Sequence, residues 1–386
     1  MSGGGKAGAF DKTFDHTRQW NIEASRSEVK MSTKITTQDV LKALTAIQDP
    51  DLHRDIVSLG FVKDVQVADS RISFTIELTT PACPVRDQLA ASAKQAVQAL
   101  GVKDVEVRMT WNVTSSKGTK PANLIPHVKN TIAVASGKGG VGKSTVAANL
   151  AVALMRAGAK VGLMDTDVYG PSVPMLMGGR EEPKVVEGKI EPPIEYGIKI
   201  ISMAYSLPKG EAVIWRGPML HKTMHQFLGE VRWGELDYLV MDLPPGTGDI
   251  QLSLSQTIPL TGAVIVSTPQ DLALTVASKA IAMFQKLKVP ILGLVENMSY
   301  YVCPQCGHRE DIFGHGGARE AAAKLGFPFL GEIPLDTAIR VQSDSGKPVA
   351  LDSTTVYGRA FQEAAAALAA QVSIANFEVG QEISIE

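Results

Sequence analysis

A glycine-rich segment, residues 137–145, reads GKGGVGKST and lies between an apolar, strand-like run (131–135) and a helical run (147–156). In this strand–turn–helix context, glycines let backbone N–H groups turn towards phosphate oxygens, and the positive end of the helix dipole adds to the attraction. The motif predicts that Lys143 reaches the β- and γ-phosphates and that the Ser144 hydroxyl binds Mg²⁺. We therefore expect a nucleoside triphosphate to be held by Gly137, Gly139, Gly140, Val141, Gly142, Lys143, Ser144 and Thr145.

Aspartates stand at the ends of two later apolar runs. Asp165 and Asp167 close the run that starts at residue 161, and Asp242 ends the run 238–242. Carboxylates at strand ends beside a bound nucleotide suit Mg²⁺ binding or the positioning of an attacking water. We expect Asp165 and Asp242 to bind Mg²⁺ in this way, while simple turn capping stays open as an alternative for these carboxylates.

A cysteine pair forms the second motif, C-P-x-C-G at residues 303–307. Such a knuckle presents two thiolates to one metal, whereas zinc and iron–sulfur centres normally need four ligands. The chain has only one further cysteine, so two copies of Cys303 and Cys306 from a homodimer would complete a four-sulfur site. His308 and His315 lie nearby as less favoured ligands, and buried structural cysteines are the remaining alternative.

The third cysteine, Cys83, lies between an expected strand (71–78) and an expected helix that starts at Pro84. A helix N-terminus favours the thiolate over the thiol. We therefore expect Cys83 to be a reactive thiol or a transient metal ligand, with a structural cysteine as the competing interpretation.

Hydrophobic periodicity divides the chain into five segments. From residue 129, short apolar strands alternate with helices, which predicts an α/β fold with a mostly parallel sheet and helices on both faces. A helix–strand–strand–helix–strand order before it predicts a small α+β domain. The expected segments are a disordered extension (1–33), the α+β domain (34–111), a linker (112–128), the α/β domain (129–371) and an acidic tail (372–386).

Bulk composition excludes several function classes. The chain is 45% hydrophobic and 20% charged, with a formal net charge of −2. Because this balance shows no excess of basic residues, we do not expect nucleic acid as a partner. No apolar run approaches the roughly 18 residues of a membrane span, and we expect no membrane association. An odd count of three cysteines favours a reducing, cytoplasmic location.

The loop GKGGVGKST also carries a lysine directly after its first glycine, and in this it resembles the deviant phosphate-binding loop of the MinD/ParA/nitrogenase iron protein class. The resemblance implies a P-loop NTPase in which Lys138 crosses a dimer interface to the partner's nucleotide. It further implies that Asp167 orients the attacking water and that Asn297 and Pro334 lie at the adenine base. In this class Lys138, Lys143, Asp167 and Asp242 would carry catalysis.

Residues 129–370 resemble the Mrp/ApbC family of ATP-dependent iron–sulfur cluster carriers, through strings such as DTDVYGPS, DLPPGTGD and ENMSY followed by CPQC. Residues 36–111 resemble the iron–sulfur-assembly domain often fused in front of it, with TTPACP at 79–84 as the mark. The resemblance implies a homodimeric ATPase that uses ATP and Mg²⁺ and holds a bridging [4Fe–4S] cluster. Apo iron–sulfur proteins and a cluster-assembly scaffold would be its partners.

Two other functions stay open at this point. A positioning ATPase of the MinD or ParA kind would end in a basic amphipathic helix or carry a basic DNA-binding face, and the acidic end of this chain, 378–386, favours neither. A zinc-bridged dimeric ATPase without carrier function is also open, because the cysteine motif accepts either metal.

Overall fold

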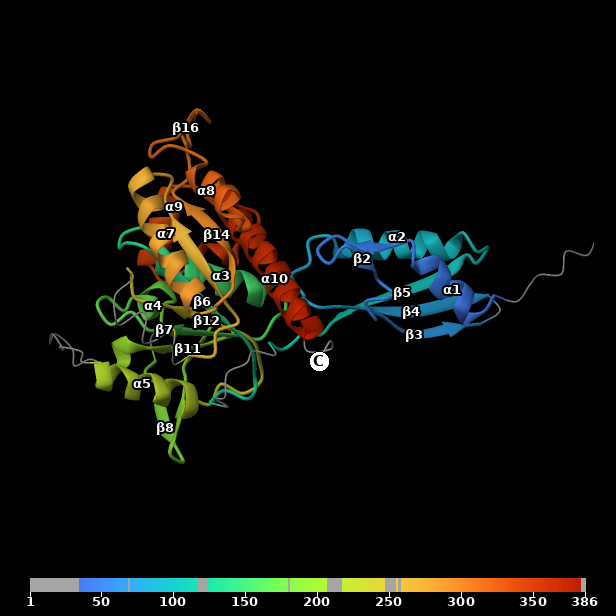
Figure 1. Ribbon diagram of the computed structural model, residues 1–386, viewed down its shortest axis with the longest axis horizontal. Helices are drawn as coiled ribbons and strands as arrows, with labels where there is room; N and C mark the ends of the chain where they lie inside the picture. The colour runs from blue at the N-terminus through green and yellow to red at the C-terminus, as the bar shows by residue number, and fades with distance from the viewer. Residues whose placement is uncertain are drawn as a thin grey trace, which may run out of the picture.

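The computed structural model describes residues 35–382, apart from 69, 117–123, 180, 207–216, 247–254 and 256–257. The expected N-terminal extension and the middle of the expected linker lie outside the described residues. Figure 1 shows a small N-terminal domain beside a larger domain that contains the glycine-rich segment.

The N-terminal domain is built in the expected helix–strand–strand–helix–strand order, with one additional short strand pair. In its three-stranded sheet β3 runs antiparallel to β4, and β4 runs parallel to β5. The apolar side chains of β4 occupy alternate positions and lie on the face that the helices cover, because successive side chains of a strand point to opposite faces of the sheet. The elements are α1 (Thr37–Leu44), β1 (Gln48–Asp49), β2 (Arg54–Asp55), β3 (Val62–Val67), β4 (Arg71–Leu78), α2 (Arg86–Gln98) and β5 (Asp104–Trp111).

The larger domain is organised around an eight-stranded sheet of order β10-β11-β7-β12-β6-β13-β14-β17. Every neighbouring pair is parallel except β10 with β11, which confirms the mostly parallel sheet. The strands are β6 (Val128–Ser136), β7 (Val161–Asp165), β10 (Ile194–Glu195), β11 (Ile198–Ser202), β12 (Leu236–Asp242), β13 (Gly262–Ser267), β14 (Ile291–Asn297) and β17 (Phe329–Ile333).

Helices cover both faces of this sheet, as the alternation of strands and helices predicts. One hydrophobic core joins the sheet to α3 (Lys143–Arg156), α4 (Val173–Leu176) and α10 (Val356–Glu382). A second core on the other face joins it to α5 (Gly217–Gly229), α7 (Asp271–Lys286) and α8 (Gly317–Leu325). The remaining described elements are β8 (Lys184–Val186), β9 (Lys189–Glu191), η1 (Met203–Ser206), β15 (Tyr301–Val302), β16 (Arg309–Glu310), α9 (Thr337–Asp344) and η2 (Val349–Leu351).

The C-terminal helix α10 continues beyond the boundary expected at residue 371. Val372, Ser373 and Asn376 are buried, and the Asn376 amide donates hydrogen bonds to the Thr114 carbonyl and to the Asn130 side chain. Residues of the expected acidic tail are therefore helical and packed as far as these contacts reach. No described helix combines the length and the apolarity that crossing a bilayer requires.

The two domains touch at the edge of the large sheet where the parallel strands begin. Tyr238 lies near the start of β12, and its hydroxyl is 3.4 Å from the Thr80 hydroxyl. Trp111 packs against Gly158, just after α3, where an added Cβ would come within 3.1 Å of the indole. The guanidinium of Arg54 lies over the ring of Phe377, 5.5 Å from its centroid. The N-terminal domain thus docks on the side opposite the glycine-rich loop.

Candidate functional site: a phosphate-binding loop and an exposed cysteine pair

The glycine-rich segment forms the turn between β6 and α3, as the motif predicts. A Cβ at Gly137 would lie 2.4 Å from the backbone of Val276 in α7, so this position must lack a side chain. At Gly142 the backbone has φ +79°, and a Cβ there would lie 2.2 Å from the Asn297 amide nitrogen. Close packing from both sides therefore fixes the path of the loop.

A pocket of about 330 Å³ opens on this loop at the carboxyl ends of the strands. Lys143, Ser144, Thr145 and Asp167 line it together with Lys138, so the structure brings these predicted residues to one place. Asn297 and Pro334 do not line this pocket, and their assignment to adenine stays a prediction. Residues that the sequence reasoning did not assign to the site also line the pocket: Ser136, Ser172, Leu176 and Pro245.

Lys143 is the charged centre of the pocket floor. Its side chain is only 6% exposed, and its Nζ lies 2.5 Å from Asp242 Oδ1 and 3.6 Å from Asp167 Oδ2. The Ser144 hydroxyl lies 3.3 Å from the same nitrogen. A cation held between two carboxylates at the base of a pocket is well placed to receive the phosphates of a nucleotide.

Asp165 and Asp242 lie side by side at the ends of β7 and β12. Burial raises the pKa of Asp165 to about 7, and the charge of Asp242 adds to this effect. The pKa of Asp242 is also raised by burial, although Lys143 opposes the shift. Two buried carboxylates at neighbouring strand ends repel each other when both are charged, and a bound cation would relieve the repulsion.

Hydrogen bonds distinguish the two aspartates. Asp165 accepts bonds from the Ser202 hydroxyl (2.9 Å) and from the backbone N–H groups of Asp167 and Val173 (both 3.1 Å), so it holds the following loop. In contrast, Oδ2 of Asp242 is buried without a hydrogen-bond partner among the described residues. This orphaned oxygen and the Ser144 hydroxyl are hard oxygen ligands, and they fit Mg²⁺. Asp242 is therefore better suited to the metal than Asp165.

Lys138 and Asn297 make different contacts around the loop. Lys138 Nζ lies 3.5 Å from Gln270 Oε1 just before α7. The Asn297 amide donates a 2.8 Å hydrogen bond to the carbonyl of Val141 within the loop. Asn297 therefore supports the phosphate-binding loop from the end of β14, a role that its position at a strand end did not reveal.

The cysteine pair lies on the tip of the β15–β16 hairpin, which projects from the domain in Figure 1. The Cys303 N–H donates to the His308 carbonyl (2.9 Å), and Gly307, with φ +71°, donates to the Cys303 carbonyl (2.8 Å). Cys306 is exposed and Cys303 is partly exposed. Backbone N–H groups of the turn, chiefly that of Cys306, lower the pKa of the Cys303 thiol.

Within the described residues, no group of three or more His, Cys, Asp and Glu side chains lies close enough to hold a metal ion. Val302 directly before the turn and Ile312 after β16 are 39% and 50% exposed. The exposed thiols and these two apolar side chains thus belong to one solvent-facing segment, residues 302–312.

Cys83 corrects the expectation of a stabilised thiolate. Helix α2 begins at Arg86, so Cys83 lies before its N-cap residue, Val85. Burial raises the pKa of Cys83 to about 11, and the nearby carboxylates of Asp51 and Asp49 add to this shift. Local sequence indicated the helix terminus but not the acidic, partly buried surroundings of the sulfur.

We expect Cys83 to react slowly with iodoacetamide at pH 8 in metal-free protein, because only the thiolate attacks and most Cys83 is then protonated. Its rate should rise about tenfold per pH unit up to pH 10, since a raised pKa moves thiolate formation to higher pH. Peptide mass spectrometry measures the modification of each cysteine, with exposed Cys306 as the fast reference. A Cys83 rate that levels off below pH 9 would contradict the raised pKa.

Comparisons with known proteins find family matches for both domains of the chain. A family model described as NUBPL iron-transfer P-loop NTPase matches residues 127–372, and one described as iron-sulfur cluster assembly protein matches residues 37–109. The iron-sulfur cluster carrier protein of Deinococcus radiodurans is 49% identical over 87% of this chain and 95% of its own length. The protein of that name from Synechocystis is 44% identical over 88% of this chain and 99% of its own.

One solved structure resembles the larger domain in fold and in sequence. It is a nucleotide-binding protein from Archaeoglobus fulgidus in complex with ADP, 45% identical, with a TM-score of 0.53. The match covers 57% of this chain and 88% of that protein.

Proposed function

Because the chain belongs to the family of NUBPL iron-transfer P-loop NTPases, we propose that it is an ATPase that carries an iron–sulfur cluster and delivers it to apo-proteins. The observation that carries the proposal is the pairing of a phosphate-binding pocket with an exposed C-P-x-C-G hairpin in one domain. The nucleotide site and the thiol pair are thus both attached to the same sheet, after β6 and after β14.

In the proposed reaction, Lys143 binds the β- and γ-phosphates and the N–H groups of the loop surround them. Ser144 and Asp242 would hold Mg²⁺, which neutralises charge on the phosphates when it is bound. Asp165 keeps the loop that carries Asp167 in place, and Asp167 orients the attacking water at the edge of the pocket.

The cluster is the cargo of this reaction, and we propose that a homodimer holds it. A four-sulfur site needs Cys303 and Cys306 from two chains, because the sequence contains only one other cysteine. The exposed position of the hairpin and of Cys306 supports such an interface. A bridging [4Fe–4S] cluster between two hairpins would then be released when the dimer opens.

Anaerobic reconstitution of the wild-type protein tests the proposal. We expect one [4Fe–4S] cluster per two chains, and transfer of that cluster to a model apo-ferredoxin that speeds up or slows down with ATP. Iron, sulfide and zinc analysis and size-exclusion chromatography measure metal and dimer together. A chain that binds one zinc per dimer and donates nothing would instead favour the zinc-bridged ATPase.

A further inference from the structure

We propose that Glu296 is a positioning residue that ties the cysteine loop, residues 298–316 between β14 and α8, to the phosphate-binding loop, so that nucleotide binding orders the hairpin of Cys303 and Cys306 within it. The inference deepens the proposed function and rests on it. It assigns a structural route by which the pocket and the thiol pair influence one another.

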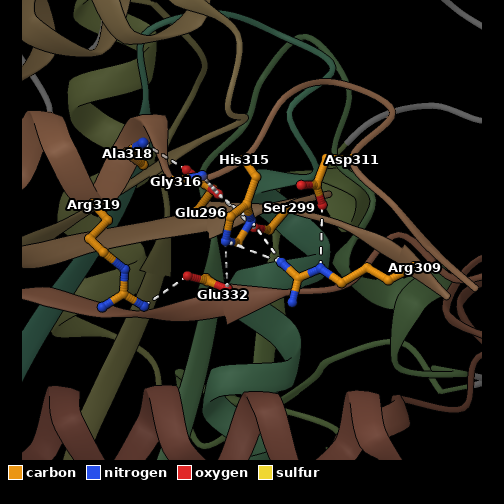
Figure 2. A network of polar contacts seen from close by, with 9 residues as sticks. All are labelled: Glu296, Ser299, Arg309, Asp311, His315, Gly316, Ala318, Arg319 and Glu332. Atoms are coloured by element: carbon orange, nitrogen blue, oxygen red, sulfur yellow. Dashed lines mark hydrogen bonds and ion pairs between the residues drawn. The ribbon is translucent and has the colours of Figure 1, made fainter.

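Glu296 is fully buried, and its carboxylate binds both the start and the end of the cysteine loop (Figure 2). At the start it accepts a 2.5 Å hydrogen bond from the hydroxyl of Ser299. At the end it accepts bonds from the backbone N–H groups of Gly316 (2.9 Å) and Ala318 (2.7 Å), at the beginning of α8. A buried charge satisfied by three donors fixes their relative positions strongly.

The next residue along β14, Asn297, faces the phosphate-binding loop and donates to the Val141 carbonyl. Two successive side chains of one strand therefore bind two different functional loops, because their directions alternate. The same strand end is tied to β17, since the Ser299 N–H donates to the Ile333 carbonyl and the Leu335 N–H donates to the Tyr300 carbonyl. In this arrangement a shift of the phosphate-binding loop would act on the base of the hairpin through Asn297 and its neighbour Glu296.

A second layer of charged contacts covers this connection on the outside, as Figure 2 shows. His315 lies 3.1 Å from the Ser299 hydroxyl and 3.8 Å from Glu332, which also pairs with Arg319 of α8 (2.7 Å). Arg309 of β16 lies 3.0 Å from His315 and stacks on the ring of Tyr300. Strand β16 is thereby linked to the buried Glu296 carboxylate through His315 and Ser299.

Both ring nitrogens of His315 lie within this network, so it serves the loop rather than the metal. The Cys303–Cys306 turn extends beyond this network, at the tip of the β15–β16 hairpin. Movement at the base of the hairpin is therefore transmitted to the sulfurs through the two short strands β15 and β16.

Amide hydrogen exchange of residues 301–318 in the metal-free, full-length protein, with and without ADP and Mg²⁺, tests the inference. In wild type we expect the nucleotide to slow exchange of this segment on the order of fivefold, a typical lower value for coupling between sites. Glu296→Gln keeps the shape but replaces one accepting oxygen with a donor, and should reduce the change to less than about twofold.

Glu310→Gln is the matched control, because it removes the same charge from an exposed position on the same hairpin. It should respond to ADP as wild type does. Ser299→Ala is the second variant in case Glu296→Gln does not fold, and it should also lose most of the response while ADP still binds. The inference is overturned if the segment does not respond to ADP in wild type, or if Glu296→Gln and Ser299→Ala respond as strongly as wild type does.

Because this measurement needs no cluster, its result is independent of cluster delivery. A protein that fails to transfer clusters but shows the response lost in Glu296→Gln would contradict the proposed function and support the connection. Cluster transfer that depends on nucleotide to the same extent in wild type and in Glu296→Gln would support the proposed function and contradict the connection through Glu296.

Discussion

Replacing Cys303 with alanine should reduce the cluster content of the reconstituted protein to nearly zero, not to half. In a symmetric dimer each chain supplies two of the four sulfurs, so one substitution removes two ligands from the shared site. Cys306→Ala should have the same effect, since its sulfur lies on the same exposed turn. Iron and sulfide analysis per chain, together with visible absorption after anaerobic reconstitution, measures the loss.

Cys83→Ala provides the matched control for this experiment. Its sulfur lies in the N-terminal domain, so the variant should keep the wild-type content of one cluster per two chains. A wild-type content of one cluster per chain, or a half-filled Cys303→Ala protein, would contradict the bridging arrangement.

Lys143→Ala should lower the ATP hydrolysis rate by about a hundredfold or more, because charge developing on the phosphates loses its nearest cation. The effect should fall on the chemical step as well as on binding, since Lys143 lies at the pocket floor beside Asp167 and Asp242. Steady-state phosphate release measures the rate, and circular dichroism checks that the fold is kept. Turnover equal to that of wild type would rule out the phosphate-binding assignment.

Lys138→Ala separates the two lysines of the same loop. Its side chain reaches towards Gln270 and not towards the carboxylates, so nucleotide affinity of the single chain should change little. If Lys138 acts on the nucleotide of a partner chain, hydrolysis and ATP-dependent dimer formation should both be lost. Normal hydrolysis by this variant would show that the interface does not use it.

Local patterns predicted the parts of this protein that depend on neighbouring residues. The expected strand 71–78, now β4, the apolar runs of β7 and β12, and the glycine-rich turn before α3 all appear close to the expected positions. Aspartates at strand ends meet Lys143 because parallel strands bring their carboxyl ends to one edge. Fold class and pocket were therefore accessible from sequence.

Contacts between distant segments were not accessible in the same way. Glu296 is separated from Gly316 and Ala318 by about twenty residues, and nothing in the local pattern marks it as different from another acidic strand residue. The carboxylates that raise the pKa of Cys83 also come from a separate turn. The helical continuation of α10 past residue 371 depends on tertiary packing, which overrides a weak local signal.

The docking of the N-terminal domain separates the two kinds of thiol. Cys83 follows the Thr80 contact at the amino edge of the sheet, whereas the hairpin leaves from the carboxyl edge, after Asn297. Strands of five to seven residues lie between these edges, a span on the order of 20 Å at about 3.3 Å per residue. One metal ion cannot bridge such a gap, so within a chain any shared cargo must leave one thiol site before it reaches the other.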